Sequence, residues 1–481
     1  MMRTKYTLGG VVVSRPEGAS RAIVIVLASC GLVASFMQTL VVPLIPVFPR
    51  LLHAAPADAS WVVTVTLLAA AVITPVSGRL GDLYGKRRMI LVSLAVLIVG
   101  SVVSATTSAL AFQILGRGLQ GCAMGVIPLG ISIMRDELPP ERVGGAISLM
   151  SATLGVGGAI GLPVAAIVAE NADWHVLFWT AAGLGLACAL LILTVVPESP
   201  VCTPAPFDYF GAFGLAAGLL CLLIPVVKGG TWGWTSLPTL GLAALAVVIL
   251  LGWGAYQLRR HDPLVDLRVS ARRPVLFTNL ASIMVGFALY AMALSFPQLL
   301  QAPSSTGYGL GQSMVESGLT LAPNGLVMML LSPVSARLIN RFGPRPTLMT
   351  GALVIAAGYG FAIVLMGNAL ELITASVIIG AGVGIAYAAM PALIMGSVPV
   401  TETASANGLN ALMRSVGTAV SSAVMAAMLA QLTISVGGLA VPSLAGFRAT
   451  FAVAACAALA GVALAALVPK RRPAPVLVGV A

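Results

Sequence analysis

The sequence predicts an all-α integral membrane protein with fourteen transmembrane helices, which form two six-helix pseudo-repeat bundles plus two inserted central helices. Three observations predict this class. Hydrophobic residues make up 59% of the 481 residues and charged residues only 9%, whereas a soluble domain carries about 25% charged residues. The apolar residues fall in long runs, and the basic residues gather in every second loop between them. A disordered chain is excluded, because disorder needs low hydrophobicity and high charge.

Fourteen apolar runs are each long enough to cross a bilayer as a helix, which takes about 20 residues. A β-barrel is excluded because its strands alternate polar and apolar residues. The shortest polar breaks between neighbouring runs lie at residues 106–108 and 367–368. The predicted spans are residues 22–44, 60–78, 89–107, 110–134, 144–168, 175–195, 209–227, 237–257, 274–299, 314–336, 347–367, 371–395, 404–431 and 448–468.

The distribution of basic residues predicts the orientation. With the N-terminus in the cytoplasm, the cytoplasmic segments hold 21 Lys and Arg residues and the opposite side holds three, Arg50, Lys228 and Arg448. Cytoplasmic loops of membrane proteins are enriched in Lys and Arg. The sequence therefore predicts a multi-pass protein of the cell membrane with both termini in the cytoplasm. This placement of basic residues in cytoplasmic loops also explains the net charge of +11, so no nucleic-acid partner is needed to account for it.

No reactive or cofactor-binding cluster is visible. The six cysteines show no CxxC or CxxH spacing, and five of them fall inside apolar runs, so we expect no metal site. No phosphate-binding GxxxxGK[ST] segment occurs, which argues against ATP-driven transport within this chain. The sequence predicts no cofactor and no catalytic residue, so we expect the protein not to be an enzyme.

An internal repeat divides the chain. The segment 78–87 reads GRLGDLYGKR, and the segment 258 residues later reads ARLINRFGPR, with Arg, Leu, an aromatic residue, Gly and Arg at matching places. Two equivalent halves are a transporter architecture whose substrate site lies between the halves. The predicted organisation is an N-terminal tail (1–21), a six-helix bundle (22–200), two inserted helices with a linker (201–273), a second bundle (274–468) and a C-terminal tail (469–481).

Four short stretches stand out beyond the apolar pattern. They are GRLGDLYGKRR at 78–88, LGRGLQG at 115–121, GVGGAIGLP at 155–163 and WHVLF at 174–178. Together they resemble motifs of the major facilitator superfamily, and specifically of its fourteen-helix drug:proton antiporter branch, over essentially the whole chain. The resemblance implies an exporter of small molecules that works by alternating access and proton antiport. Of several departures from the branch, one matters most: Met37, followed by Gln38, stands where helix 1 usually carries an Asp.

The resemblance implies that the first stretch and its repeat form a latch that closes the cytoplasmic gate. Glycines there allow close helix approach, and a carboxylate is favoured at a helix N-terminus. The alternative is a static turn that only sets topology. The predicted gate residues are Gly78, Asp82, Gly85, Arg87, Arg337 and Gly343.

Candidate substrate or coupling residues lie within or beside the predicted spans. Arg117 and Arg414 are the embedded charges, and each is either functional or an anchor to backbone carbonyls. Arginine cannot release its proton, so a proton carrier must be an acid near a helix end, and Glu316 and then Asp58 are the candidates. Both acids have the alternative of simply marking helix starts. The remaining candidates are Gln38, Gln120 and Asn324 for polar contacts, and Gly157, Gly161 and Pro163 for a helix-packing hinge.

The sequence thus predicts a secondary active exporter of hydrophobic or amphipathic small molecules, with drug or metabolite efflux as the role. The predicted partners are a small-molecule substrate, protons and the lipid bilayer. An anionic or neutral substrate fits the two embedded arginines. The alternatives are an uncoupled facilitator or organic-anion importer, and a non-transporting membrane sensor or scaffold.

Overall fold

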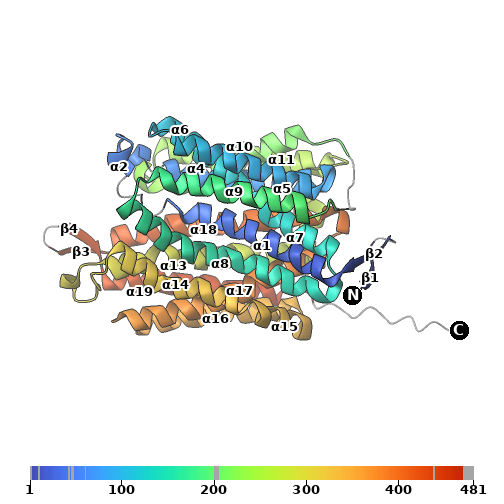
Figure 1. Ribbon diagram of the computed structural model, residues 1–481. Helices are drawn as coiled ribbons and strands as arrows, with labels where there is room; N and C mark the ends of the chain where they lie inside the picture. The colour runs from blue at the N-terminus through green and yellow to red at the C-terminus, as the bar shows by residue number, and fades with distance from the viewer. Residues whose placement is uncertain are drawn as a thin grey trace.

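Long helices that run side by side make up the protein in the computed structural model (Figure 1), which describes residues 3–8, 11–41, 44, 48–59, 61–199, 205–436 and 439–469. Among these residues, 13 helices are long and apolar enough to cross a membrane, and a bent pair of helices raises the number to 14. The predicted all-α membrane fold is therefore confirmed.

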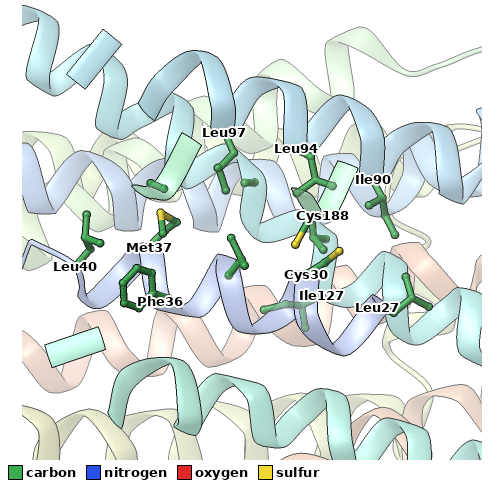
Figure 2. Close-up of a cluster of buried hydrophobic side chains, with 14 of the residues drawn as sticks. Leu27, Cys30, Phe36, Met37, Leu40, Ile90, Leu94, Leu97, Ile127 and Cys188 are labelled. Carbon is green, nitrogen blue, oxygen red and sulfur yellow. The ribbon is translucent and has the colours of Figure 1, made fainter. Parts of the chain in front are cut away.

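The first half of the chain forms one group of helices around a shared apolar core. Its core cluster draws almost entirely on residues between Ile23 and Val196, with Cys30, Met37 and Cys188 at its centre (Figure 2). The long helices are α1 (Glu17–Thr39), α4 (Trp61–Tyr84), α5 (Lys86–Ala105), α6 (Leu110–Cys122), which continues through η2 (Ala123–Gly125) into α7 (Val126–Glu137), α8 (Pro140–Asn171) and α9 (His175–Val195). Two short helices, α2 (Phe48–Leu51) and α3 (Pro56–Ala59), connect α1 to α4.

The last part of the chain forms a second group with its own core, drawn from residues between Ala281 and Val468. Its helices are α13 (Arg273–Gln301), η3 (Ser304–Thr306), α14 (Met314–Leu330), α15 (Ser332–Phe342), α16 (Pro344–Val364), α17 (Ala369–Met395), η4 (Val400–Glu402), α18 (Thr403–Gln431) and α19 (Leu444–Ala466). The two separate cores agree with the predicted division into halves, whose exact boundaries stay a prediction.

Between the two halves come α10 (Tyr209–Trp232), α11 (Leu237–Arg259) and the short α12 (Leu267–Ser270). The α10 helix packs on α4 of the first half and on α18 of the second. Much of α10 and α11 is exposed apolar surface, including Phe210 and Leu237, as a lipid-facing helix requires. The inserted pair therefore bridges the two halves along one side of the bundle.

Two antiparallel hairpins lie at opposite ends of the bundle. Strands β1 (Arg3–Leu8) and β2 (Val11–Pro16) pair ahead of α1, and β3 (Thr433–Val436) and β4 (Leu439–Pro442) pair between α18 and α19. In Figure 1, β1 and β2 lie at the right-hand end, and β3, β4 and α2 at the left-hand end. The hairpins were not predicted, because hydropathy identifies only the spans.

Some helix bounds differ from the prediction for local reasons. The α1 helix begins at Glu17, inside the predicted tail, and it ends at Thr39 rather than at residue 44. The predicted span 314–336 is the bent pair α14 and α15, with a bend of 40°. Pro333 in the first turn of α15 lacks the N–H that would continue the helix. Lys228, predicted in a loop, lies inside α10 and is buried.

One matching pair of contacts reflects the internal repeat. The guanidinium of Arg87, at the start of α5, donates to the carbonyl of Leu193 near the end of α9 at 2.7 Å. The guanidinium of Arg345, at the start of α16 and 258 residues later, donates to the carbonyl of Ala466 at the end of α19 at 2.5 Å. Each arginine therefore ties the third helix of its half to the last one.

Candidate gate and intramembrane charge sites

Asp82 joins the two halves at the end of the bundle that carries β1 and β2. Its carboxylate accepts hydrogen bonds from the backbone N–H of Ala404 at 3.2 Å and of Ser405 at 2.8 Å. These two groups belong to the first turn of α18, where N–H groups have no partner within the helix. The carboxylate therefore caps a helix of the other half, where the helix dipole favours negative charge, and the side chain of Asp82 is 1% exposed.

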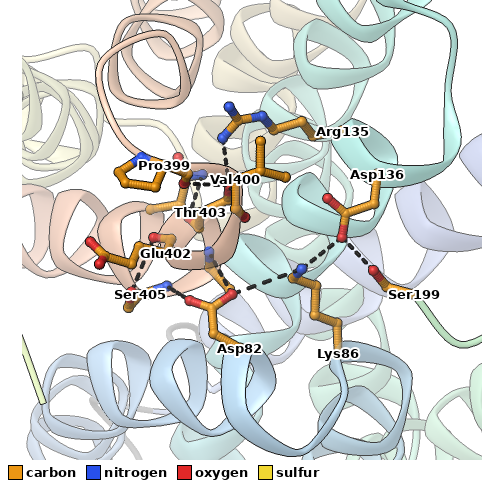
Figure 3. Close-up of polar contacts among 12 residues, drawn as sticks. Asp82, Lys86, Arg135, Asp136, Ser199, Pro399, Val400, Glu402, Thr403 and Ser405 are labelled. Atoms are coloured by element: carbon orange, nitrogen blue, oxygen red, sulfur yellow. Dashed lines mark hydrogen bonds and ion pairs between the residues drawn. The ribbon is translucent and has the colours of Figure 1, made fainter. Parts of the chain in front are cut away.

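A second set of charges surrounds this cap (Figure 3). The ammonium of Lys86 is fully buried and lies 2.6 Å from Asp136 Oδ2 and 3.8 Å from Asp82 Oδ1. Ser199 donates to the same oxygen of Asp136 at 2.5 Å. Arg135, beside Asp136 on α7, reaches across to the hydroxyl of Thr403 on α18. Lys86 therefore bridges two buried carboxylates.

Close packing accompanies the polar contacts. A Cβ added at Gly78 would lie 2.5 Å from the carbonyl oxygen of Ala404, so α4 touches the start of α18 directly. Gly85 has a φ of 108° and separates α4 from α5, and a Cβ there would meet the carboxylate of Glu198. A glycine is therefore required at both predicted positions, one for close approach and one for the turn.

The remaining predicted gate residues do not join the halves. Among the residues that the structure describes, Arg87 bonds within its own half, since its backbone N–H donates to Glu198 at 3.0 Å and its guanidinium to Leu193. Arg337 is exposed on α15. Gly343 has a φ of 86° and forms the turn before α16. The second copy of the repeat thus keeps the turn. Asn340, which occupies the position equivalent to Asp82, lies beside Gly144 at the start of α8.

The linker that follows the inserted helices packs against the same region. Asp208 caps α10 and accepts hydrogen bonds from Tyr256 at 3.0 Å and Gln257 at 2.9 Å, and Gln257 in turn accepts one from the N–H of Leu264. Leu264 and Val265 are buried in a cluster with residues of α4, α10 and α18. The linker therefore fills the seam between α4 and α18 next to the cap.

Arg117 is a buried anchor. Its guanidinium donates to the carbonyls of Met37 at 3.1 Å and Val62 at 3.4 Å and to the side-chain oxygen of Gln120 at 2.6 Å. Gln120 donates onward to Ser101 at 2.8 Å. Arg117 is 1% exposed and forms no salt bridge among the described residues. These contacts match the anchoring alternative and tie α1, α4 and α5 to α6.

Arg414 has different surroundings. It is half-buried, and its guanidinium donates to the side-chain oxygen of Asn410 at 2.6 Å and lies 5.2 Å from the centre of the Tyr387 ring. Asn410 is held by Asn279 and Ser282 of α13. Arg414 also forms no salt bridge within the described part of the chain. Among the described residues its guanidinium therefore makes fewer hydrogen bonds than that of Arg117.

The other predicted polar and packing residues lie away from the network around Asp82. Asn324 is buried and donates to the carbonyl of Ser376 at 2.6 Å, which joins α14 to α17, whereas Gln38 is half-buried on α1. Of the three residues predicted for a packing hinge, Gly157 and Gly161 pack α8 on Ser35, Phe36 and Thr39 of α1 in the same half. The third, Pro163, faces Gly318 of the other half, as the neighbouring Gly155 faces Met328.

The two candidate coupling acids lie at helix starts. Glu316 is exposed and forms a capping box with Ser313, in which each side chain accepts from the other residue's backbone N–H. Asp58 is exposed in the first turn of α3. Both arrangements are what a helix start requires by itself. The structure brings neither acid near Arg117 or Arg414, and their role in coupling stays a prediction.

Sequence reasoning missed the residues that complete the network around Asp82. Asp136 and Thr403 lie outside the recurring stretches, and nothing in either segment alone links them to residues 82–86. One signal was available for Asp136: two consecutive acids, at 136 and 137, end an apolar run, and acids at such a position need partners.

Comparisons with known proteins agree with this geometry. A family model described as the Major Facilitator Superfamily matches residues 27–422 and 280–479. The tetracenomycin C resistance and export protein of Streptomyces glaucescens is 30% identical over 314 residues, which is 65% of this chain and 57% of that protein. Multidrug resistance protein 3 of Bacillus subtilis is 23% identical over 74% of this chain and 70% of its own length. The chain thus spans little more than half the length of the first of these relatives.

Two solved structures share the fold. The human organic anion transporter MFSD10 superposes with a TM-score of 0.67 and 16% identity, over 94% of this chain and 100% of the other. The proton:xylose symporter XylE superposes with a TM-score of 0.68 and 14% identity, over 95% of this chain and 97% of the other. At these identities the likeness concerns the fold alone.

Proposed function

This chain belongs to the Major Facilitator Superfamily, and on that premise we propose that it is a secondary active exporter of hydrophobic or amphipathic small molecules that works by alternating access. The chain belongs to a transporter family and is not an enzyme. The names of its relatives, which include an antibiotic resistance and export protein and a multidrug resistance protein, support the efflux role. Within the superfamily, the bent pair α14–α15 and the inserted pair α10–α11 favour the fourteen-helix drug:proton antiporter branch.

The observation that carries the proposal is the cap of Asp82 on α18. It is a non-covalent contact between the two halves, built from groups that would be solvated if the halves separated. The Lys and Arg residues of the flanking segments favour a cytoplasmic location for this end. In this conformation the cytoplasmic gate is closed, and transport requires the cap to break and re-form in each cycle.

Proton coupling has to be assigned to an acid outside the middle of the spans. All fifteen carboxylates of the sequence lie in loops or near helix ends, and the mid-span charges are arginines. Coupling would therefore use an acid near a helix end, with Glu316 first and Asp58 second. The same observation favours one second candidate function, an uncoupled facilitator.

An efflux assay tests the proposal. Cells of a bacterium that lacks its own drug pumps would be loaded with rhodamine 6G, a cationic dye, or with fluorescein, an anionic dye, and the release of each dye followed by fluorescence. We expect release of at least one dye with the wild type, strongly reduced release of that dye with Asp82→Asn, and wild-type release with the control Asp262→Asn in the loop after α11. Release no faster than from cells without the protein would contradict the export proposal.

Coupling needs a separate assay. The protein would be placed in liposomes that contain a pH-sensitive dye, and whichever of the two dyes the cells release would be added outside. Proton movement in the wild type that is lost in Glu316→Gln would support antiport through Glu316. Dye flux without proton movement would support the facilitator instead.

A further inference from the structure

We propose that Arg414 binds the negatively charged group of the substrate, so that the transported compounds are amphipathic organic anions such as aromatic carboxylates and phenolates. This inference rests on the proposed transport function, because it assigns the ligand class of the site between the halves. Three features of Arg414 support it: the position of the guanidinium, the donors that the guanidinium leaves open, and the contrast between Arg414 and Arg117.

The position of Arg414 is at mid-depth and fixed. It lies eleven residues after the first residue of α18 (Thr403–Gln431), which is about 17 Å along a helix, in a membrane core about 30 Å thick. A Cβ added at Gly286 would lie 2.5 Å from the carbonyl oxygen of Arg414, so α13 and α18 are in direct backbone contact here. The backbone that carries Arg414 therefore has little freedom to move.

A chain of hydrogen bonds orients the guanidinium. The side-chain nitrogen of Asn410 donates to Asn279 at 2.9 Å and to Ser282 at 2.8 Å. Both N–H groups of that amide are therefore in use, and its oxygen is left to accept from Arg414 at 2.6 Å. All three polar partners are buried. Asn410 is thus a positioning residue that aims Arg414.

The open side of Arg414 faces the boundary between the halves. The ring of Tyr387 covers one face of the guanidinium at 5.2 Å. The backbone carbonyl of Tyr387 accepts a hydrogen bond from Ser151 of α8, in the other half, at 3.1 Å. An arginine within a membrane span faces the protein interior or water rather than lipid, because lipid exposure costs several kcal/mol. The exposed part of Arg414 therefore points into the space that a substrate crosses.

The contrast with Arg117 identifies which arginine is available. Arg117 is 1% exposed and its guanidinium donates to two carbonyls and one amide oxygen, whereas Arg414 is half-buried and donates to one amide oxygen. A guanidinium has five N–H donors and keeps its charge in proteins. A carboxylate or phenolate can accept from the remaining donors of Arg414, and an aromatic ligand can pack beside Tyr387.

A pair of matched dyes tests the proposal. Fluorescein is an anion and rhodamine 6G is a cation on the same ring system, and binding of each to the purified full-length protein is measured by fluorescence anisotropy. The variants are Arg414→Gln, which keeps a donor for Asn410 but removes the charge, and Arg414→Lys, which keeps the charge. Arg448→Gln, an exposed arginine at the start of α19, is the control for loss of one positive charge.

We expect fluorescein to bind the wild type and Arg448→Gln equally, to bind Arg414→Gln about tenfold or more weakly, and to bind Arg414→Lys with most of the affinity restored. The size follows from the loss of a hydrogen bond to a charged group. Rhodamine 6G should bind Arg414→Gln at least as well as the wild type.

Equal affinity of fluorescein for Arg414→Gln and wild type would overturn the proposal, as would a wild type that does not bind fluorescein. A parallel loss of both dyes in Arg414→Gln and Arg414→Lys would also overturn it, because Arg414 would then support the structure. Charge-dependent fluorescein binding without any dye transport in liposomes would uphold the ligand class and contradict the export function, so the two failures are distinguishable.

Discussion

Asp82 and Ser405 are separated by 323 residues in the sequence, yet the carboxylate of the first accepts the backbone N–H of the second at 2.8 Å. One residue belongs to α4 of the first half and the other to α18 of the second. The contact is buried, so its partners would have to be rehydrated for the halves to part at this end. It follows that this single carboxylate influences how often the gate opens.

Replacement of Asp82 by Asn should open the gate more often. Asn keeps one acceptor oxygen but loses the negative charge at the start of α18, at a cost of about 1–3 kcal/mol for a charged hydrogen bond, or roughly tenfold in the open population. In a variant without native cysteines, Ala404→Cys, fully buried in the closed gate, should react with a maleimide about tenfold faster when Asp82→Asn is added. Unchanged labelling would show that the cap does not hold the gate.

Replacement of one member of the buried ion pair of Lys86 and Asp136 should lower the stability of the protein much more than replacement of both members. Lys86→Met leaves Asp136 buried without its cation, which typically costs about 3–5 kcal/mol. The double variant Lys86→Met/Asp136→Asn removes the unpaired charge and should recover most of the thermal stability in detergent. Additive losses in the double variant would mean that the two side chains do not interact.

Addition of one methyl group at Gly78 should hinder closure of the gate. The new Cβ would lie 2.5 Å from the carbonyl oxygen of Ala404, so α4 and α18 would have to move apart. Gly78→Ala should therefore raise maleimide labelling of Ala404→Cys. Gly183→Ala on α9, where an added Cβ meets nothing within 4 Å, is the control, and equal labelling in both glycine variants would contradict this packing.

Burial of its apolar residues should keep the linker after α11 packed against α4 and α18. Val265 is 5% exposed in the seam between α4 and α18, and truncation of a buried aliphatic side chain destabilises its packing by about 1–3 kcal/mol. Val265→Ala should speed tryptic cleavage after Arg260 or Arg268, two exposed sites on either side of the linker. The exposed neighbour His261→Ala should leave the rate unchanged. Equal cleavage of both variants would mean that the linker does not dock.

The fold could be predicted from the sequence because the signals for each span and for the orientation lie within short segments of the chain. Each span shows as an apolar run, and the orientation prediction needs only the count of basic residues in each loop. The 40° bend before Ser332 and the early start of α1 were not predicted, since hydropathy registers neither the missing N–H of Pro333 nor a helical turn outside an apolar run.

The candidate site followed only in part because its contacts join distant segments. The stretch at residues 78–88 pointed to Asp82 and Gly78, but not to their partners Ser405 and Ala404. Arg117 and Arg414 were equivalent as embedded charges in the sequence. Only the three-dimensional contacts separate a guanidinium bonded to the Met37 and Val62 carbonyls from one that leaves donors open.

The most direct measurement of the central claim is a pair of distances between spin labels on the two halves. One pair, at Tyr84 and Phe342, lies at the end with the Asp82 cap, and the other, at Ser108 and Leu370, lies at the opposite end; all four positions are exposed. Alternating access predicts that Asp82→Asn lengthens the first distance and shortens the second, compared with the unmodified Asp82. Distances that stay unchanged, or that both change in the same direction, would contradict it.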